Sequence, residues 1–243
     1  MSHWYQPDLA YIHDVGFGDY AHQAAPALLA QLQSHHLSSG LVVDLGCGSG
    51  IWAEYLCQAD YQVFGVDLSE AMIELARTRI PQAEFRVDSI FTTPIPACQA
   101  VTAIGEVLNY LFDSDRNTSR LVPVFQRIFA ALTSGGLFIF DIVEPGQVPP
   151  ETISQSFREG EDWVVLVEKY EDLSSMTLTR RIITFRQDGS FYRKVEEVHK
   201  QQLYDSAEIA TQLQQIGFQV QVLDHYGPFQ LPIARKAVIA CKR

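Results

Sequence analysis

The sequence predicts a doubly wound α/β fold built on a mostly parallel sheet, with an antiparallel β insertion. From about residue 40, short apolar runs alternate with segments of helical period, which is the pattern of repeated strand–helix–strand units. After Pro145 this alternation ends, and runs rich in β-branched residues predict the insertion over residues 150–200. A chain of 243 residues is long enough for one such domain and too short for two full domains.

The parallel part of the sheet is expected to begin with a strand at residues 41–45. A helix then starts near Trp52, and residues 62–67 form the second strand. Ser69 supplies the hydroxyl of a helix N-cap, and the helix stops before Pro81. Further strands are expected at 84–88, 100–104 and 137–141. A helix runs from about Ser119 to Leu132 before the last of these strands, and Gly135-Gly136 marks its end.

The insertion is expected to consist of strands at residues 163–170, 176–185 and 191–199. Asp188-Gly189 lies before the last of these runs and is a strong signal for a hairpin turn. A final helix over 206–215 leads to strands at 218–223 and 237–241.

Composition and charge narrow the classes of partner. The formal net charge is −11, and Lys and Arg cluster nowhere except near the C-terminus, so the phosphates of a nucleic acid would find little attraction. The four cysteines lie far apart without a C-x-x-C pair, which argues against a zinc site and favours reduced thiols in the cytoplasm. No stretch has the signature of a signal peptide or a membrane span. Together with the net charge and the cysteine spacing, this predicts that the protein has no metal, nucleic acid or membrane partner.

A glycine-rich turn follows the first strand. Residues 44–50 read Asp-Leu-Gly-Cys-Gly-Ser-Gly, between a predicted strand and a predicted helix. Glycines let the backbone turn tightly and approach a ligand, and the helix presents free N–H groups, so a nucleotide-like ligand is indicated. Asp67 ends the next strand about 20 residues later, where a carboxylate accepts hydrogen bonds from both hydroxyls of a ribose.

The spacing of the glycines separates two nucleotide cofactors. A dinucleotide-binding turn has the pattern G-x-G-x-x-G, whereas this turn reads G-x-G-x-G with Ile51 in place of the last glycine. The departure counts against a nicotinamide-dependent oxidoreductase, which stays the alternative enzyme. Residues 43–50 resemble the first motif of the class I S-adenosylmethionine-dependent methyltransferases.

The resemblance extends from about residue 10 to the C-terminus and implies S-adenosylmethionine as the cofactor, with S-adenosylhomocysteine as the product. It implies that Asp44 lies near the methionine amino group and that Asp67 holds the ribose. Residues 65–72 and 87–90 are similar to the family's second and third motifs, in which Asp88 accepts from the adenine amino group. The cofactor-binding residues that the resemblance implies are Tyr11, Tyr20, Asp44, Gly46, Cys47, Gly48, Gly50, Asp67, Leu68, Met72, Asp88, Ser89, Ile90, Gly105 and Glu106. For Tyr11 and Tyr20, surface packing of an N-terminal helix is the alternative.

The resemblance also indicates the class of acceptor. Residues 104–110 fill the family's fourth motif but lack the Asn-Pro-Pro-Tyr type of sequence found in enzymes that methylate nucleic acid bases. The β insertion resembles the cover over the acceptor pocket of small-molecule methyltransferases. The implied fold is therefore a Rossmann-like sheet of seven strands whose active-site cleft is covered by the insertion. The implied activity is methyl transfer to N, O or C of a small molecule, and a cofactor-binding regulatory protein without catalysis is the alternative from another class.

A general base is needed only where the acceptor must lose a proton, and His199 and His13 are the candidates. We expect His199 on a solvent-facing strand and His13 in a loop, so a surface role stays open for both. Glu106 is expected near the sulfonium or at the cap of the next helix. Arg180-Arg181 is expected to pair with an anionic acceptor or to lie on a solvated strand edge.

On this resemblance, residues 1–243 form a single methyltransferase domain in four parts. Residues 1–35 are the N-terminal lid and helix, and 36–148 the cofactor-binding core. Residues 149–202 are the antiparallel β insertion that covers the acceptor, and 203–243 the C-terminal helix and β-hairpin that complete the sheet.

Overall fold

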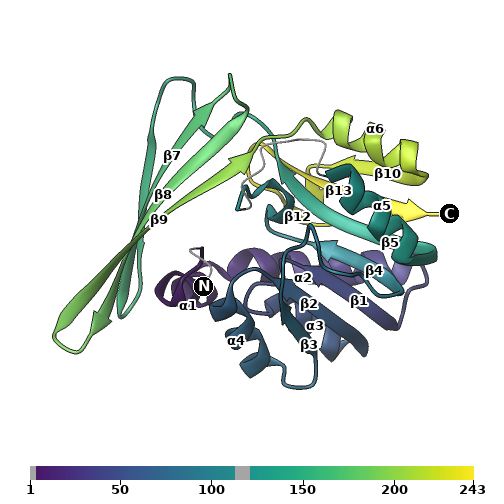
Figure 1. The fold of residues 1–243 in the computed structure, drawn as a ribbon, viewed down its shortest axis with the longest axis horizontal. Helices are drawn as coiled ribbons and strands as arrows, with labels where there is room; N and C mark the ends of the chain where they lie inside the picture. Colours follow the sequence, from purple (N-terminus) through teal and green to yellow (C-terminus); the bar gives the residue numbers. More distant parts are fainter. Residues whose placement is uncertain (1–3, 113–120) are drawn as a thin grey trace.

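The computed structural model describes residues 4–112 and 121–243. Its centre is a seven-stranded sheet in the order β10-β13-β5-β4-β1-β2-β3, and a separate four-stranded sheet has the order β6-β7-β8-β9 (Figure 1). The predicted fold class is therefore confirmed. The strands of the large sheet are β1 (Gly40–Leu45), β2 (Tyr61–Asp67), β3 (Glu84–Val87), β4 (Cys98–Ala103), β5 (Leu132–Val143), β10 (Phe218–Leu223) and β13 (Arg235–Lys242).

The strand order brings the glycine-rich turn to the centre of one sheet edge. Strands β1 to β5 run parallel, and β13 pairs antiparallel with both β5 and β10. The order reverses between β1 and β4, so the connections that leave these two neighbouring strands depart in opposite directions. In an open α/β sheet a ligand binds in the crevice outside the carboxyl ends of the strands at such a point.

Helices cover both faces of the large sheet. One apolar core joins the sheet to α5 (Leu121–Ala131) and α6 (Ser206–Ile216). The other joins it to α2 (Asp19–Ser34), α3 (Ile51–Gln58) and α4 (Glu70–Arg79). The middle strands therefore have apolar side chains on both faces, as buried parallel strands do. No helix in the described ranges has the length and apolar character to cross a bilayer.

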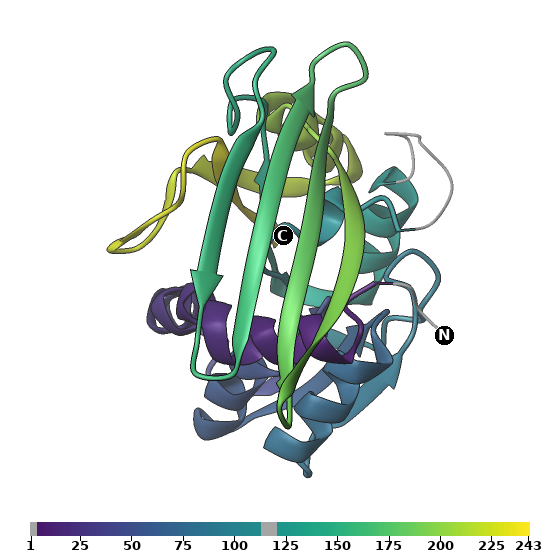
Figure 2. The ribbon, with the colours of Figure 1, turned by 90° about the vertical axis from the view of Figure 1, so that its left-hand side faces the viewer.

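The insertion forms a sheet of its own that stands away from the core. Its strands are β6 (Ser154–Glu159), β7 (Trp163–Asp172), β8 (Thr177–Asp188) and β9 (Phe191–Gln202), all antiparallel. Helix α1 (Pro7–Phe17) lies between this sheet and the core, as Figures 1 and 2 show. Leu9 and Ile12 of α1 pack against Trp163, Val165 and Ile182 of the sheet, so the N-terminal segment joins the two layers.

The sequence predictions of the elements need several corrections. Strand β5 begins at Leu132, before Gly135-Gly136, because Leu132 pairs with Cys98 across a β-bulge. The predicted helix start at Ser119 lies outside the described residues, and the first described residue of α5 is Leu121. Strand β6 and the small hairpin of β11 (His225–Tyr226) and β12 (Phe229–Gln230) were not predicted. The loop expected at His13 is wrong, since His13 lies within α1.

Candidate functional site

A cavity of about 580 Å³ lies at the point where the strand order reverses. Its walls come from the glycine-rich turn, from the ends of β2 and β4, from α1 and α2, and from the inner face of β7 and β8. The cavity thus runs from the carboxyl edge of the large sheet to the insertion sheet. Most of the surface that lines it is apolar, with charged groups at a few places.

The glycine-rich turn is held to the neighbouring strand by its backbone. Gly46 N and Cys47 N both donate to Val66 O, at 2.7 and 3.0 Å. Gly46, Gly48 and Gly50 have φ values of 69°, 53° and 82°, which L-residues rarely adopt. A Cβ at Gly48 would meet no heavy atom within 4 Å and Gly48 lines the cavity, so the turn leaves open space for a ligand there.

Asp67 joins this turn to the start of the next helix. Its Oδ2 accepts from Gly48 N at 2.9 Å and its Oδ1 from Ser69 N at 2.8 Å. Burial raises the pKa of Asp67, and the backbone donors at Ser69 and Gly48 oppose that rise. The carboxylate is therefore fixed in place beside the cavity and retains lone pairs for a further donor.

Asp44 lies deeper, at the end of a buried chain of hydrogen bonds. Trp52 Nε1 donates to Thr102 Oγ1 at 3.1 Å, and Thr102 Oγ1 donates to Asp44 Oδ1 at 2.7 Å. Burial raises the pKa of Asp44 to about 7, the hydrogen bond from Thr102 opposes the rise, and the charge of Asp67 adds to it. A cation beside a buried carboxyl with a raised pKa stabilises its ionised form.

The pKa of Asp44 makes stability depend on pH. A carboxyl whose pKa is raised in the folded state contributes stability below its unfolded value of about 4 and loses it as the pH rises through the folded value of about 7. We therefore expect Asp44→Asn to reduce the loss of unfolding free energy between pH 4.5 and 7.5, measured by urea unfolding of the ligand-free protein. The Asn oxygen still accepts from Thr102.

The matched control is Asp224→Asn, at an exposed position away from the cavity. It should lose stability with pH as steeply as the wild-type protein. Part of the decrease of unfolding free energy with pH should persist in Asp44→Asn, because burial also raises the pKa of Asp141 to about 7. Equal slopes for Asp44→Asn and the wild type would mean that Asp44 is ionised in the folded protein at pH 4.5.

Asp141, near the carboxyl end of β5, fixes a strained turn. Gly105 and Glu106 have φ values of 94° and 67°, and their N–H groups donate to the two oxygens of Asp141 at 2.8 and 2.7 Å. The same carboxyl accepts from Tyr20 Oη at 3.1 Å and from Tyr226 Oη at 3.3 Å. Positive φ at a residue other than glycine is costly and persists only where the surroundings enforce it. Asp141 therefore fixes the backbone that lines the cavity after β4.

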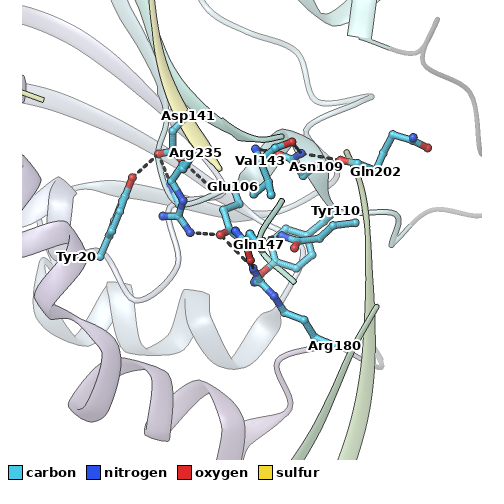
Figure 3. A network of polar contacts seen from close by, with 12 residues as sticks. Tyr20, Glu106, Asn109, Tyr110, Asp141, Val143, Gln147, Arg180, Gln202 and Arg235 are labelled. Atoms are coloured by element: carbon cyan, nitrogen blue, oxygen red, sulfur yellow. Dashed lines mark hydrogen bonds and ion pairs between the residues drawn. The ribbon is translucent and has the colours of Figure 1, made fainter. Parts of the chain in front are cut away.

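Glu106 is held by two arginines that approach from different elements. Arg180 Nη1 of β8 lies 2.7 Å from Glu106 Oε2, and Arg235 at the start of β13 pairs with Oε1 (Figure 3). Gln201 Nε2 donates to Oε2 at 2.7 Å. Glu106 is 2% exposed and makes no capping hydrogen bond, so the predicted alternative of a helix cap is wrong. Arg180 is likewise no solvated edge residue, because β8 lies inside its sheet.

The two histidine candidates lie close together near the N-terminal segment. The solvent-facing position predicted for His199 is wrong: its side chain is fully buried, because it points to the inner face of β9. His199 Nε2 lies 2.8 Å from Glu197 Oε2, and this carboxylate also accepts from Tyr5 N and Gln6 N. The pair thus anchors the N-terminal segment and does not line the cavity.

His13 does line the cavity, with its ring against Tyr5 and Phe17. Burial lowers the pKa of His13 to about 4, so the imidazole is neutral at pH 7. It can accept a proton, but a conjugate acid of such low pKa holds that proton weakly.

Most of the residues that the resemblance implied are brought together in one place. The cavity is lined by Tyr20, Asp44, Gly46, Cys47, Gly48, Asp67, Leu68, Met72, Ser89, Ile90, Gly105 and Glu106.

Three of the predicted residues lie outside that lining. Tyr11 faces the insertion sheet, where the Arg186 guanidinium lies 3.4 Å from its ring centre, so its predicted contact with the cofactor is wrong. Gly50 serves packing, since a Cβ there would lie 3.1 Å from Ala76 Cβ of α4. Asp88 is half-buried and accepts from Ser89 N beside the cavity, so its predicted role stays a prediction.

The sequence analysis missed Asp141, Arg235 and Gln201 and did not connect Arg180 to Glu106. The signal for Asp141 was available, because it lies near the carboxyl end of a parallel strand, at the same sheet edge as Asp44 and Asp67. No comparable signal exists for Arg235, which lies 129 positions from Glu106. Among the described residues, no cluster of His, Cys, Asp and Glu is arranged to hold a metal ion.

Comparisons with known proteins agree on this architecture. A family described as a methyltransferase domain matches residues 42–136. An S-adenosylmethionine-dependent methyltransferase structure from Clostridium acetobutylicum ATCC 824 is similar, with a TM-score of 0.80, 22% identity, and coverage of 96% of this chain and 97% of that one. Residues 42–136 thus match a methyltransferase domain, and the whole chain has the fold of an S-adenosylmethionine-dependent methyltransferase. The predicted enzyme class and the predicted cofactor, S-adenosylmethionine, are therefore confirmed.

Two further relatives show the range of this methyltransferase's similarity. A trans-aconitate 2-methyltransferase of Variovorax paradoxus (strain S110) is 32% identical over 141 residues, which cover 56% of this chain and 51% of that protein. The structure of S-adenosylmethionine-bound CalS10, an amino pentose methyltransferase from Micromonospora echinaspora, has a TM-score of 0.77 at 17% identity and covers 96% of both chains. The chain thus shares its fold with a methyltransferase named for an amino sugar and part of its sequence with one named for an organic acid.

Proposed function

We propose that the methyltransferase transfers a methyl group from S-adenosylmethionine to a small-molecule acceptor inside the cavity. The observation that carries the proposal is the continuity of this cavity. It begins at the glycine-rich turn and ends at Val165, Val167 and Ile182 on the inner face of the insertion sheet. A donor and an acceptor can therefore meet in one apolar space, and bringing two reactants into line is a large part of such catalysis.

The residues around the turn fit the chemistry of the cofactor. Asp67, fixed by two backbone donors, accepts from the ribose hydroxyls, and the open space at Gly48 and Gly105 admits the methionine part. The ammonium of that part lies beside Asp44, since a cation there stabilises the ionised carboxylate. Leu68, Met72 and Ile90 offer the apolar slot for the adenine ring. These assignments explain why position 48 requires a residue without a side chain.

Gly48→Ala should separate the ligand effect from the backbone effect. The new Cβ projects into the cavity, so we expect S-adenosylhomocysteine to bind at least fivefold more weakly by isothermal titration. The left-handed backbone itself costs an L-residue about 1 kcal/mol of folding stability.

Gly189→Ala is the matched control for that variant. Gly189 lies between β8 and β9 with a φ of 62°, and a Cβ there also meets nothing within 4 Å. The control should lose the same stability and keep wild-type affinity for S-adenosylhomocysteine. If both variants bound the ligand as the wild type does, the open space at Gly48 would not be the binding site.

The chain positions the reactants and excludes water. The bound cofactor supplies an electrophilic methyl group on a sulfonium. Asp67 and the turn at Gly48 would hold the cofactor, and Val165, Val167 and Ile182 would position an acceptor in line with its methyl. Helix α1 and the segment anchored to Glu197 form one wall of the cavity. Where the acceptor carries a proton that must leave, neutral His13 is the lining group that can take it.

Ligand titration tests the proposed function. S-adenosylhomocysteine should bind tightly, whereas NAD and ATP should not compete with it. Tight binding of NAD in its place would support the nicotinamide-dependent alternative. Binding of S-adenosylhomocysteine without methyl transfer to any small molecule would support a regulatory protein. A screen of metabolite pools for a cofactor-dependent gain of one methyl group in mass identifies the acceptor.

Charge and thiols support two further parts of the proposal. The net charge of −11 supports a small molecule over a nucleic acid as the acceptor. Cys47, Cys57, Cys98 and Cys241 are all free thiols, which supports a reducing compartment and hence the cytoplasm.

A further inference from the structure

A row of basic residues crosses the inner face of the insertion sheet above the cavity. Lys169 of β7 is paired in register with Arg180 of β8, and Arg180 is paired with His199 of β9. Side chains of directly paired residues on neighbouring strands point to the same face of a sheet. Lys169 and Arg180 both line the cavity.

The three members of this row differ in their partners. His199 is bonded to Glu197, and Arg180 is paired with Glu106. Within residues 4–112 and 121–243, the Lys169 ammonium has neither a hydrogen bond nor an ion pair, although the side chain is half-buried. Burial lowers the pKa of Lys169, and the charge of Arg180 lowers it further. A half-buried cation beside a second cation is costly unless an anion is brought to it.

Charge at this end of the cavity is unbalanced. Among residues 4–112 and 121–243, the charged lining groups at this end are the cations Lys169, Arg180 and Arg235 and the carboxylate of Glu106. Asp44 and Asp67 belong to the other end, beside the glycine-rich turn. A ligand that enters next to the insertion sheet therefore meets more positive than negative charge, which favours an anionic group and opposes an ammonium.

Two neutral groups add donors to the same wall. The Gln147 Oε1 atom accepts from Arg180 Nη2 at 3.4 Å, so its amide nitrogen stays available as a donor (Figure 3). The hydroxyl of Ser156 on β6 also lines the cavity. Gln147 is held there because its backbone N donates to Glu171 Oε1 at 2.6 Å. The wall thus presents a cation and polar donors, which is the donor set that a carboxylate requires.

We propose that Lys169 binds a carboxylate of the methyl acceptor, so that the acceptor of this methyltransferase is an organic acid. The inference rests on the proposed function and names its substrate class. Lys169 is then a specificity-determining residue: it selects acids and repels acceptors that carry an ammonium. Arg180, fixed by Glu106, reinforces the selection through its charge.

The test measures binding to the methyltransferase saturated with S-adenosylhomocysteine, so it needs no turnover. The probes are trans-aconitate, its uncharged trimethyl ester and glucosamine, each titrated by calorimetry. We expect trans-aconitate to bind and the other two not to bind. Lys169→Met should weaken trans-aconitate binding at least tenfold, and Lys169→Arg should restore most of the affinity.

Lys194→Met is the matched control, because Lys194 is exposed and lies outside the cavity lining. It should bind every probe as the wild type does. Glucosamine bound in preference to trans-aconitate, an equal affinity for the trimethyl ester, or no response to Lys169→Met would each overturn the inference. Failure of the wild-type protein to bind S-adenosylhomocysteine would instead overturn the proposed function, so the two failures are distinguishable.

Discussion

Asp67→Ala is expected to weaken the binding of S-adenosylhomocysteine at least tenfold, which corresponds to about 1.4 kcal/mol. The reason is that the Asp67 carboxylate is the half-buried acceptor that we assign to the ribose hydroxyls, and its removal leaves those donors without a partner. The substitution also removes the two hydrogen bonds that fix Gly48 and Ser69. Isothermal titration of the ligand gives the affinity.

Asp67→Asn separates these two contributions. The amide oxygen can still accept one backbone hydrogen bond, so the turn is less disturbed than in the alanine variant, but the charge is lost. Asp224→Ala, an exposed position outside the cavity lining, should leave the affinity unchanged. Wild-type affinity in Asp67→Ala would show that the ribose is bound elsewhere.

Glu106→Gln is expected to lower the free energy of unfolding by about 3 kcal/mol. The isosteric change leaves the largely buried guanidinium groups of Arg180 and Arg235, which are 14% and 12% exposed, without their carboxylate. Removal of one partner from a buried ion pair is strongly destabilising because the remaining charge stays desolvated. Urea unfolding at pH 7, followed by circular dichroism, measures the change.

Glu168→Gln provides the comparison for Glu106→Gln. Glu168 pairs with Arg181 on the solvent-exposed side of the insertion sheet, at 3.1 Å. Water screens this pair, so its removal should move the urea midpoint very little. A similar midpoint for both variants would mean that the Glu106 network contributes no more than a surface ion pair.

The fold followed from local patterns in the sequence. Alternating strand and helix signals predicted the parallel core, because strand and helix have different periods that apolar residues must match. The glycine-rich turn and Asp67 predicted the ligand edge, because glycine conformations and a strand-end carboxylate are local features. The start of β5 at Leu132 was not predictable in this way, because it depends on pairing with Cys98 of another strand.

The site depended on contacts between distant parts of the chain. Side chains alternate between the two faces of a strand, so the sequence does not show which face of β9 is buried. Only the packing of Trp4, Tyr5 and Phe112 against His199 shows that its face is the buried one. The partners of Glu106 come from β8, β9 and β13, which lie 74, 95 and 129 positions away.

The sequence by itself determined the fold class and the part of the site built from one glycine-rich turn and the next strand. The tertiary structure decided the charge state of the cavity, since this depends on burial and on which cations and carboxylates meet across elements. Burial and long-range pairing are properties of the packed chain, whereas glycine conformations and apolar periods are properties of each segment.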